Sequence, residues 1–206
     1  MKKLIIFDMD GTLINSGDVI TNTINFVREN IGLPTIDKQT MLSQLNNPNI
    51  NSAEYFYGTS EFTDQQTKLF GEYYDKNCTK DIKLYTGIKD ILQTLQKDYI
   101  LSVATNASVE FAIKMLKALD IYSYFSLVVG ANMVANPKPK PDMLLYTLEK
   151  LNINTTNALL IGDSNKDRLS AKEANIKFIL VNWGFSNHQD GINDIEQLNK
   201  KIKEIL

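Results

Sequence analysis

The first pattern of apolar and polar positions along the chain is a short apolar run that ends in acidic residues. Residues 4–7 are four consecutive apolar residues without helical spacing, which is typical of a buried strand. Asp8 and Asp10 follow, and Gly11 comes next. Alternate residues of a strand share a face, so both carboxylates can lie at the carboxyl end of this strand, where open α/β sheets bind ligands. Such a pair can hold a hard cation and leave one carboxylate for nucleophilic or acid–base work.

Residues 15–83 have helical spacing and contain no run that predicts a strand. An apolar stripe runs from Val19 to Ile31, and the Gly-Leu-Pro sequence of residues 32–34 ends that helix. Further helices are predicted over residues 38–45, 52–57 and 63–78, between turns rich in Asn, Pro, Gly, Ser and Thr. This segment is therefore predicted to be a helical insert after the first strand.

From Gly87 onward the pattern changes to an alternation of short apolar runs and amphipathic stretches. Helices are predicted over residues 88–95, 109–119, 141–151, 166–174 and 192–206, and strands over residues 99–104, 125–129, 158–161 and 178–181. This alternation predicts an α/β fold: a Rossmann-like parallel sheet with helices on both faces. Residues 1–14 and 84–206 would form this core, and residues 15–83 a separate small helical domain.

The composition narrows the possible classes of protein. The 206 residues are 43% hydrophobic and 22% charged, with a formal net charge of −2, which is typical of a globular domain without a basic surface for nucleic acid. Cys78 is the single cysteine and His188 the single histidine, so an intrachain disulfide, a cysteine-based zinc cluster and a site with two imidazoles are excluded. No stretch approaches the length of a membrane-spanning helix. We expect a cytoplasmic monomer that binds neither membrane nor nucleic acid.

Each predicted strand of the core ends in a polar residue suited to phosphate chemistry. Thr105 and Asn106 follow one strand, Lys138 lies in a proline-rich segment after the next, and Asp163 follows a third, with Asp167 four residues later. Because parallel strands end at the same edge of a sheet, these residues are expected to converge on Asp8 and Asp10. Taken singly, Thr105 and Asn106 are as typical of a helix N-terminus, and Lys138 of a solvated loop.

Together these residues resemble the haloacid dehalogenase-like superfamily of phosphohydrolases in four ordered motifs. The motifs are Asp8-Met9-Asp10-Gly11-Thr12, the strand end at Thr105, Lys138 in Lys-Pro-x-Pro, and Gly162-Asp163-x-x-x-Asp167. The helical insert resembles the small cap domain of the superfamily's first cap type. The sequence around residues 85–88, 138–141 and 181–185 resembles the phosphoglycolate phosphatase branch. The loop at residues 45–49 departs from that branch, because it is rich in Asn where a glycine-bearing turn is usual.

The resemblance implies a role for each motif residue. Asp8 would be the nucleophile that forms an aspartyl-phosphate, and Asp10 the general acid and base. Asp8, Asp10 and Asp163 would bind Mg²⁺, with Asp10 contributing its main chain, and Asp167 would orient these ligands or Lys138. Thr105, Asn106 and Lys138 would bind the phosphoryl oxygens. The implied function is Mg²⁺-dependent hydrolysis of the phosphate monoester of a small metabolite, such as a phosphoglycolate-like compound, a sugar phosphate or a nucleotide.

Two alternatives share this motif set. One is a phosphomutase of the β-phosphoglucomutase type, which needs cap residues that retain a phosphorylated sugar. The loop at residues 45–49 has no Arg or Lys, which favours hydrolysis. The other is a non-catalytic protein that binds a phosphorylated metabolite. The intact set of Asp8, Asp10, Thr105, Lys138 and Asp163 argues against it.

Overall fold

The computed structural model describes residues 2–186 and 188–206. Its centre is a five-stranded sheet in the order β5-β4-β1-β6-β7, in which every pair of neighbours is parallel. The strands are β1 (Leu4–Phe7), β4 (Ile100–Thr105), β5 (Leu127–Gly130), β6 (Ala158–Gly162) and β7 (Lys177–Leu180). The predicted α/β fold with a parallel sheet is confirmed.

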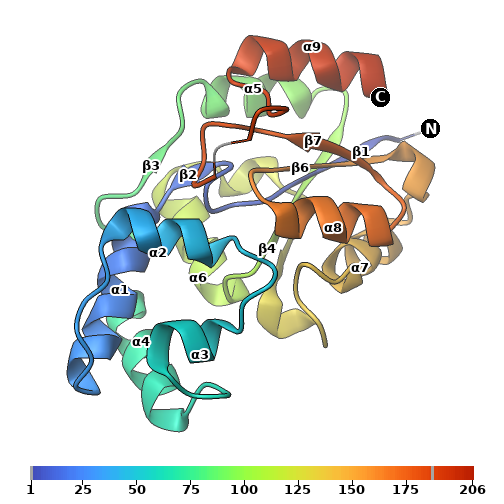
Figure 1. The fold of residues 1–206 in the computed structure, drawn as a ribbon. Coiled ribbons are helices and arrows are strands. Elements are labelled where there is room, and N and C mark those ends of the chain that lie inside the picture. The colour runs from blue at the N-terminus through green and yellow to red at the C-terminus, as the bar shows by residue number, and fades with distance from the viewer. Residues whose placement is uncertain (1, 187) are drawn as a thin grey trace.

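The side chains of β1 alternate between two buried layers, as the period of a strand requires. Ile5 and Phe7 belong to one hydrophobic cluster, and Leu4 and Ile6 belong to the other. The first cluster packs α5 (Ile88–Leu95), α6 (Val109–Ala118) and α9 (Ile195–Ile205) against the sheet. The second packs α7 (Asp142–Leu151) and α8 (Asn165–Glu173). Helices therefore cover both faces of the sheet, as predicted (Figure 1).

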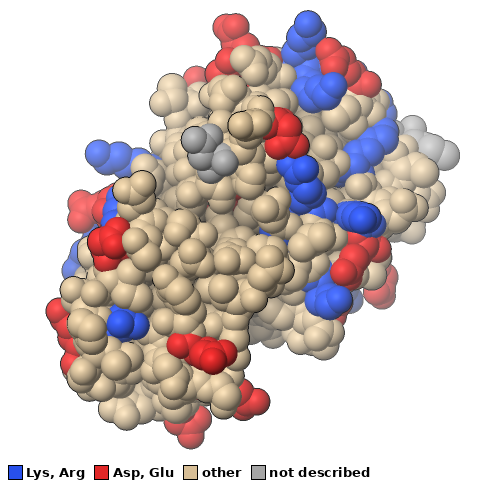
Figure 2. All heavy atoms as spheres, in the orientation of Figure 1, with Lys and Arg blue, Asp and Glu red and all other residues tan. Residues whose placement is uncertain are grey.

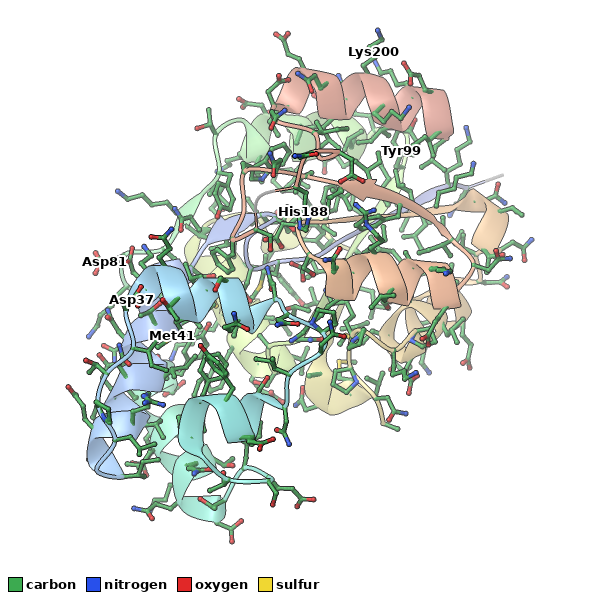
Figure 3. All side chains as sticks on the ribbon, viewed as in Figure 1. Asp37, Met41, Asp81, Tyr99, His188 and Lys200 are labelled. Carbon is green, nitrogen blue, oxygen red and sulfur yellow. The ribbon has the colours of Figure 1, made fainter. Side chains whose placement is uncertain are left out.

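Four helices form a separate helical lobe beside the carboxyl edge of the sheet, at the lower left of Figure 1. They are α1 (Gly17–Asn30), α2 (Lys38–Leu45), α3 (Ser52–Tyr57) and α4 (Asp64–Asn77). The side chain of Asp37 caps α2 by accepting from the amide of Thr40, and Met41 of the same helix is fully buried (Figure 3). Thr63 and Gln66 form a capping box that fixes the start of α4.

Two very short strands join the helical lobe to the sheet. β2 (Ile14–Asn15) pairs antiparallel with β3 (Lys83–Leu84), so the chain enters and leaves the lobe through adjacent segments. The expectation that residues 15–83 contain no strand is wrong at these two ends. A two-residue strand leaves no periodic signal in the sequence, so its pairing depends on where the lobe meets the sheet.

Other differences from the predicted elements are small and lie at loop junctions. The strand predicted from residue 125 begins at Leu127, after the 3₁₀ turn η1 (Tyr122–Tyr124). Two more 3₁₀ turns follow, η2 (Ala131–Met133) and η3 (Thr155–Asn157). The last helix begins at Ile195 rather than at Ile192, because Ile192 forms a β-bridge with Val181. Among the described residues no helix is long and apolar enough to cross a membrane.

Gly130, the last residue of β5, is a position that we expect to tolerate only glycine. A Cβ on Gly130 would lie 2.3 Å from the backbone nitrogen of Val109, at the start of α6. Gly130→Ala is therefore expected to lower the free energy of unfolding by about 1–3 kcal/mol, measured by urea denaturation. The matched control is Gly71→Ala in α4, whose Cβ would meet nothing within 4 Å. It should raise the free energy of unfolding by about 0.5–1 kcal/mol. Equal effects of the two substitutions would contradict this packing.

Candidate active site

The parallel register brings the predicted residues to one edge of the sheet. Phe7, the last residue of β1, lies opposite Val103 of β4 and Ile161 of β6. The amide of Asp8 donates to the carbonyl of Ile161 at 2.8 Å, which extends the ladder by one residue. Asp8 therefore enters the space between the ends of β4 and β6, and its side chain is 10% exposed.

Lys138 is the cation that faces Asp8. Its ammonium group donates to Asp8 Oδ1 and to Asp167 Oδ1, both at 2.6 Å, and to the carbonyl of Ala104 at 2.8 Å. Three donors thus meet three acceptors in a buried position, which is the condition for burying an ammonium group. Burial opposes the charge, but the carboxylates of Asp167 and Asp8 raise the pKa of Lys138 above its usual value. Lys138 stays charged at neutral pH.

Asp163 and Asp167 come from the end of β6 and the first turn of α8. Ser164 caps α8 by accepting from the amide of Asp167, and Asp167 Oδ2 accepts from the hydroxyl of Ser164 at 2.5 Å. Both carboxylate oxygens of Asp167 are therefore engaged by Lys138 and Ser164. Asp163 Oδ2 accepts from the amide of Phe185 at 2.8 Å and from the side chain of Asn46 at 3.2 Å.

Asp10 lies in a different environment from Asp8. Its carboxylate accepts a hydrogen bond from the hydroxyl of Ser16, and Thr105 also hydrogen-bonds to it. Burial raises the pKa of Asp10, while the hydrogen bonds from Ser16 and Thr105 and the charge of Lys138 oppose the rise. A raised pKa is the property that suits a carboxyl group to act as a general acid.

Thr105 and Asn106 lie at the end of β4, beside this group. The hydroxyl of Thr105 accepts from the amide of Ala107 at 3.1 Å. The side-chain nitrogen of Asn106 donates to the carbonyl of Lys138 at 2.8 Å. Asn106 therefore holds the loop that carries Lys138, and this bond uses one of the two N–H donors of its side chain.

The donor set fits a divalent cation. One oxygen each from Asp8, Asp163 and Asp167 lies within 4.8 Å of the others, and all three side chains are buried. Three carboxylates against the single ammonium of Lys138 leave an excess of two negative charges. Burial, and then the charges of Asp8 and Asp167, raise the pKa of Asp163 well above its usual value. Burial also raises the pKa of Asp8, to about 7, against the opposing charge of Lys138. A bound cation would relieve this repulsion.

Two glycines leave room beside Asp163. A Cβ on Gly184 would lie 2.3 Å from Asp163 Oδ2, and one on Gly11 would lie 2.4 Å from the same atom. Gly11 also has φ of +86°, a conformation that side chains disfavour. The space beside this carboxylate therefore depends on both residues lacking a side chain.

Several residues of the site carry no motif that identifies them in the sequence. They are Ser16, which bonds to Asp10; Asn46, which bonds to Asp163; and Lys166, whose ammonium donates to the carbonyl of Leu45 at 2.8 Å. Asn46 lies in the loop whose composition departs from the phosphoglycolate phosphatase branch. That departure is the one feature of the sequence that could have pointed to any of these three residues. The contacts of Asn46 and Lys166 join the loop after α2 to the sheet edge.

A cavity of about 650 Å³ opens between the sheet edge and the helical lobe. At the sheet edge it is lined by Asp8, Asp10, Thr105, Lys138 and Asp167. On the other side it is lined by side chains of α1, α3 and α4. Its volume is in the range of ordinary small-molecule sites, and its polar groups converge at one end.

Comparison with known proteins agrees with this geometry. The phosphoglycolate phosphatase of Escherichia coli K12 is 28% identical over 227 residues, covering 97% of this chain and 89% of that protein. A protein of Dickeya dadantii described as a probable phosphatase is 29% identical, covering 89% of this chain and 83% of that protein. The crystal structure of a predicted phosphoglycolate phosphatase from Haemophilus somnus superposes with a TM-score of 0.82 at 27% identity, and each chain is covered to 98%.

The decisive comparison is with a protein family rather than with a single relative. The sequence model of the family described as haloacid dehalogenase-like hydrolase matches residues 5–181, which include every motif residue described above. The chain is an enzyme, and it belongs to the haloacid dehalogenase-like hydrolase family.

Proposed function

We propose that this enzyme is a Mg²⁺-dependent phosphatase that hydrolyses the phosphate monoester of a small metabolite through an aspartyl-phosphate on Asp8. The observation that carries the proposal is the buried carboxylate of Asp8, held by Lys138 at the closed end of a cavity large enough for such a substrate. The relatives described as phosphatases support the same reaction class.

The first step follows from the different settings of the two aspartates. An oxygen of Asp8 attacks phosphorus, and the bond from phosphorus to the alcohol oxygen breaks. Asp10, whose raised pKa favours the protonated form, gives its proton to the leaving oxygen. The positive charge of Lys138 and the hydroxyl of Thr105 would stabilise the charge on the phosphoryl oxygens.

The second step reverses the proton transfer. Asp10, now a carboxylate, takes a proton from a water molecule as that water attacks the phosphorus of the aspartyl-phosphate. The bond from Asp8 to phosphorus breaks, and inorganic phosphate leaves. Ser16 keeps the carboxyl group of Asp10 in place through both steps.

Asp8, Asp163 and the main chain of Asp10 are the residues proposed to hold Mg²⁺, with Asp167 orienting Lys138. When bound, the cation would neutralise the carboxylates and the phosphoryl oxygens and orient the substrate. Hard oxygen donors of this kind suit Mg²⁺ better than softer metals.

We propose that residues 15–83 act as a cap that closes the cavity. The loop after α2 contacts the sheet edge through Asn46 and Lys166, and both bonds would break on opening. The β2–β3 pair is the place where the two connections could bend together. Opening would admit the substrate, and closure would exclude bulk water.

The cavity favours hydrolysis over phosphoryl transfer within a sugar. A mutase binds a second phosphate at the end of the cavity remote from the nucleophile, which needs cationic side chains there. Among the described residues that line the cavity, the cations are Lys138 and Lys166, which lie in the loop before α7 and in α8, and neither comes from the helical lobe.

Replacing the nucleophile gives the direct test of this function. Asp8→Asn keeps the shape of the side chain but removes its nucleophilic oxygen, so kcat for a phosphate monoester with Mg²⁺ should fall by at least about 1,000-fold. The rate of release of inorganic phosphate measures kcat. The matched control is Asp18→Asn, at an exposed residue of α1, and this variant should retain activity. Full activity of Asp8→Asn would refute the proposed function.

Metal binding is testable without turnover. A ligand that binds only the folded state stabilises it, so Mg²⁺ at about 100 times its Kd should raise Tm by about 5 °C or more. Asp163→Asn should abolish that shift while leaving the metal-free protein at least as stable, because it removes one of three mutually repelling buried carboxylates. Scanning calorimetry with and without EDTA measures both effects. An undiminished Mg²⁺ shift in Asp163→Asn would rule this residue out as a ligand.

A further inference from the structure

The side of the cavity formed by the helical lobe and α6, here called the aromatic end, is rich in aromatic side chains. Six of its lining residues are Phe56, Tyr57, Phe62, Phe70, Tyr74 and Phe111. Phe70 and Tyr74 of α4 stack at 5.3 Å between ring centroids, and Phe111 of α6 meets Tyr74 edge to face at 5.1 Å. The helical lobe and α6 thus both present aromatic rings to the cavity. Figure 2 shows that the outer face of the lobe is also mostly uncharged in that view.

Phe62 extends this aromatic group to the mouth of the cavity. It lies in the turn between α3 and α4 and is 56% exposed, although its ring meets Tyr57 edge to face at 5.9 Å. An exposed phenylalanine side chain buries little apolar surface and so contributes little to the stability of the fold. Its position suits contact with a ligand that enters between the helical lobe and the sheet.

Among the described residues that line the aromatic end of the cavity, none is a cation that could receive a negative group. Lys138 is committed to Asp8 and Asp167, and Lys166 to the carbonyl of Leu45. Arg28, a buried arginine of the helical lobe, donates to the carbonyls of Pro34 and Phe56 and is not among the residues that line the cavity.

Neutral groups complete the aromatic end. Ser52, Gln66 and Thr67 are its uncharged polar residues. Burial raises the pKa of Tyr57 to about 12, so this phenol is neutral as well. A carboxylate placed there would lose its hydration without gaining an ionic partner, which is a large cost. A flat apolar group would instead gain ring contacts and bury apolar surface.

We propose that the substrate of this enzyme is the phosphate monoester of an uncharged alcohol that carries an aromatic group, and not of a hydroxy acid such as glycolate. This inference rests on the proposed phosphatase function and names the substrate class of the same site. The phosphate lies against Asp8 and Lys138, and the aromatic group lies among the rings of Phe62, Phe70 and Phe111.

Benzyl phosphate and phosphoglycolate form a matched pair of probes. Both are phosphate monoesters of a primary alcohol, and they differ in carrying a phenyl ring or a carboxylate on the carbon that bears the phosphate oxygen. With Mg²⁺ present, kcat/KM for benzyl phosphate should exceed that for phosphoglycolate by at least about 10-fold. Ethyl phosphate, which carries neither group, should fall between them.

Variants of two exposed aromatic residues of the helical lobe make the test specific to the cavity. Phe62→Ala should lower kcat/KM for benzyl phosphate by about 3- to 10-fold, and by more than it lowers that for ethyl phosphate. Tyr55→Ala is the control, because Tyr55 is 38% exposed and is not among the residues that line the cavity, so it should leave all three values unchanged.

The outcomes separate the two proposals. Preference for benzyl phosphate, reduced by Phe62→Ala and not by Tyr55→Ala, supports the substrate class. A preference for phosphoglycolate, or equal effects of the two variants, overturns the substrate class and leaves the phosphatase function standing. Failure to hydrolyse any of the three esters with Mg²⁺ present overturns the phosphatase function, and the substrate class with it.

Discussion

The buried ammonium group of Lys138 is the interaction on which the site depends. It joins the carboxylates of Asp8 and Asp167 and the carbonyl of Ala104, and so connects β1, β4 and α8 through one side chain. Without this cation, three buried carboxylates would face one another uncompensated. The loop that carries Lys138 is held in turn by Asn106, so the end of β4 sets the position of the cation.

This arrangement is possible because the sheet is parallel around β1. Strands β4 and β6 flank β1, and their carboxyl ends come level with Asp8. Polar groups that follow these strands are therefore brought together although they lie far apart in the sequence: Lys138 is hydrogen-bonded to Asp8 across 130 positions, and carboxylate oxygens of Asp8 and Asp163 lie within 4.8 Å of each other. The helical lobe closes the open side and supplies the apolar part of the cavity. Our two proposals thus place the chemistry at the sheet edge and the selectivity in the helical lobe.

The sequence predicts most of this fold because its signals are local. Apolar runs mark the five strands of the sheet, helical spacing marks α1 to α9, and Asp8, Asn106 and Asp163 lie directly after strands. What it cannot predict depends on contacts between distant loops. The β2–β3 pair is too short to leave a pattern, and the bond between Asn46 and Asp163 depends on the path of the loop after α2. The ring of Phe62 at the cavity mouth is likewise set by the tertiary arrangement.

The central claim is that Asp8 carries the phosphoryl group during turnover. Rapid acid quenching of the enzyme with Mg²⁺ and a ³²P-labelled phosphate monoester tests it most directly. The account predicts label bound covalently to the peptide that contains Asp8, and its release by hydroxylamine, which cleaves acyl phosphates. Turnover without any label on the protein, or label on a peptide that lacks Asp8, would contradict it.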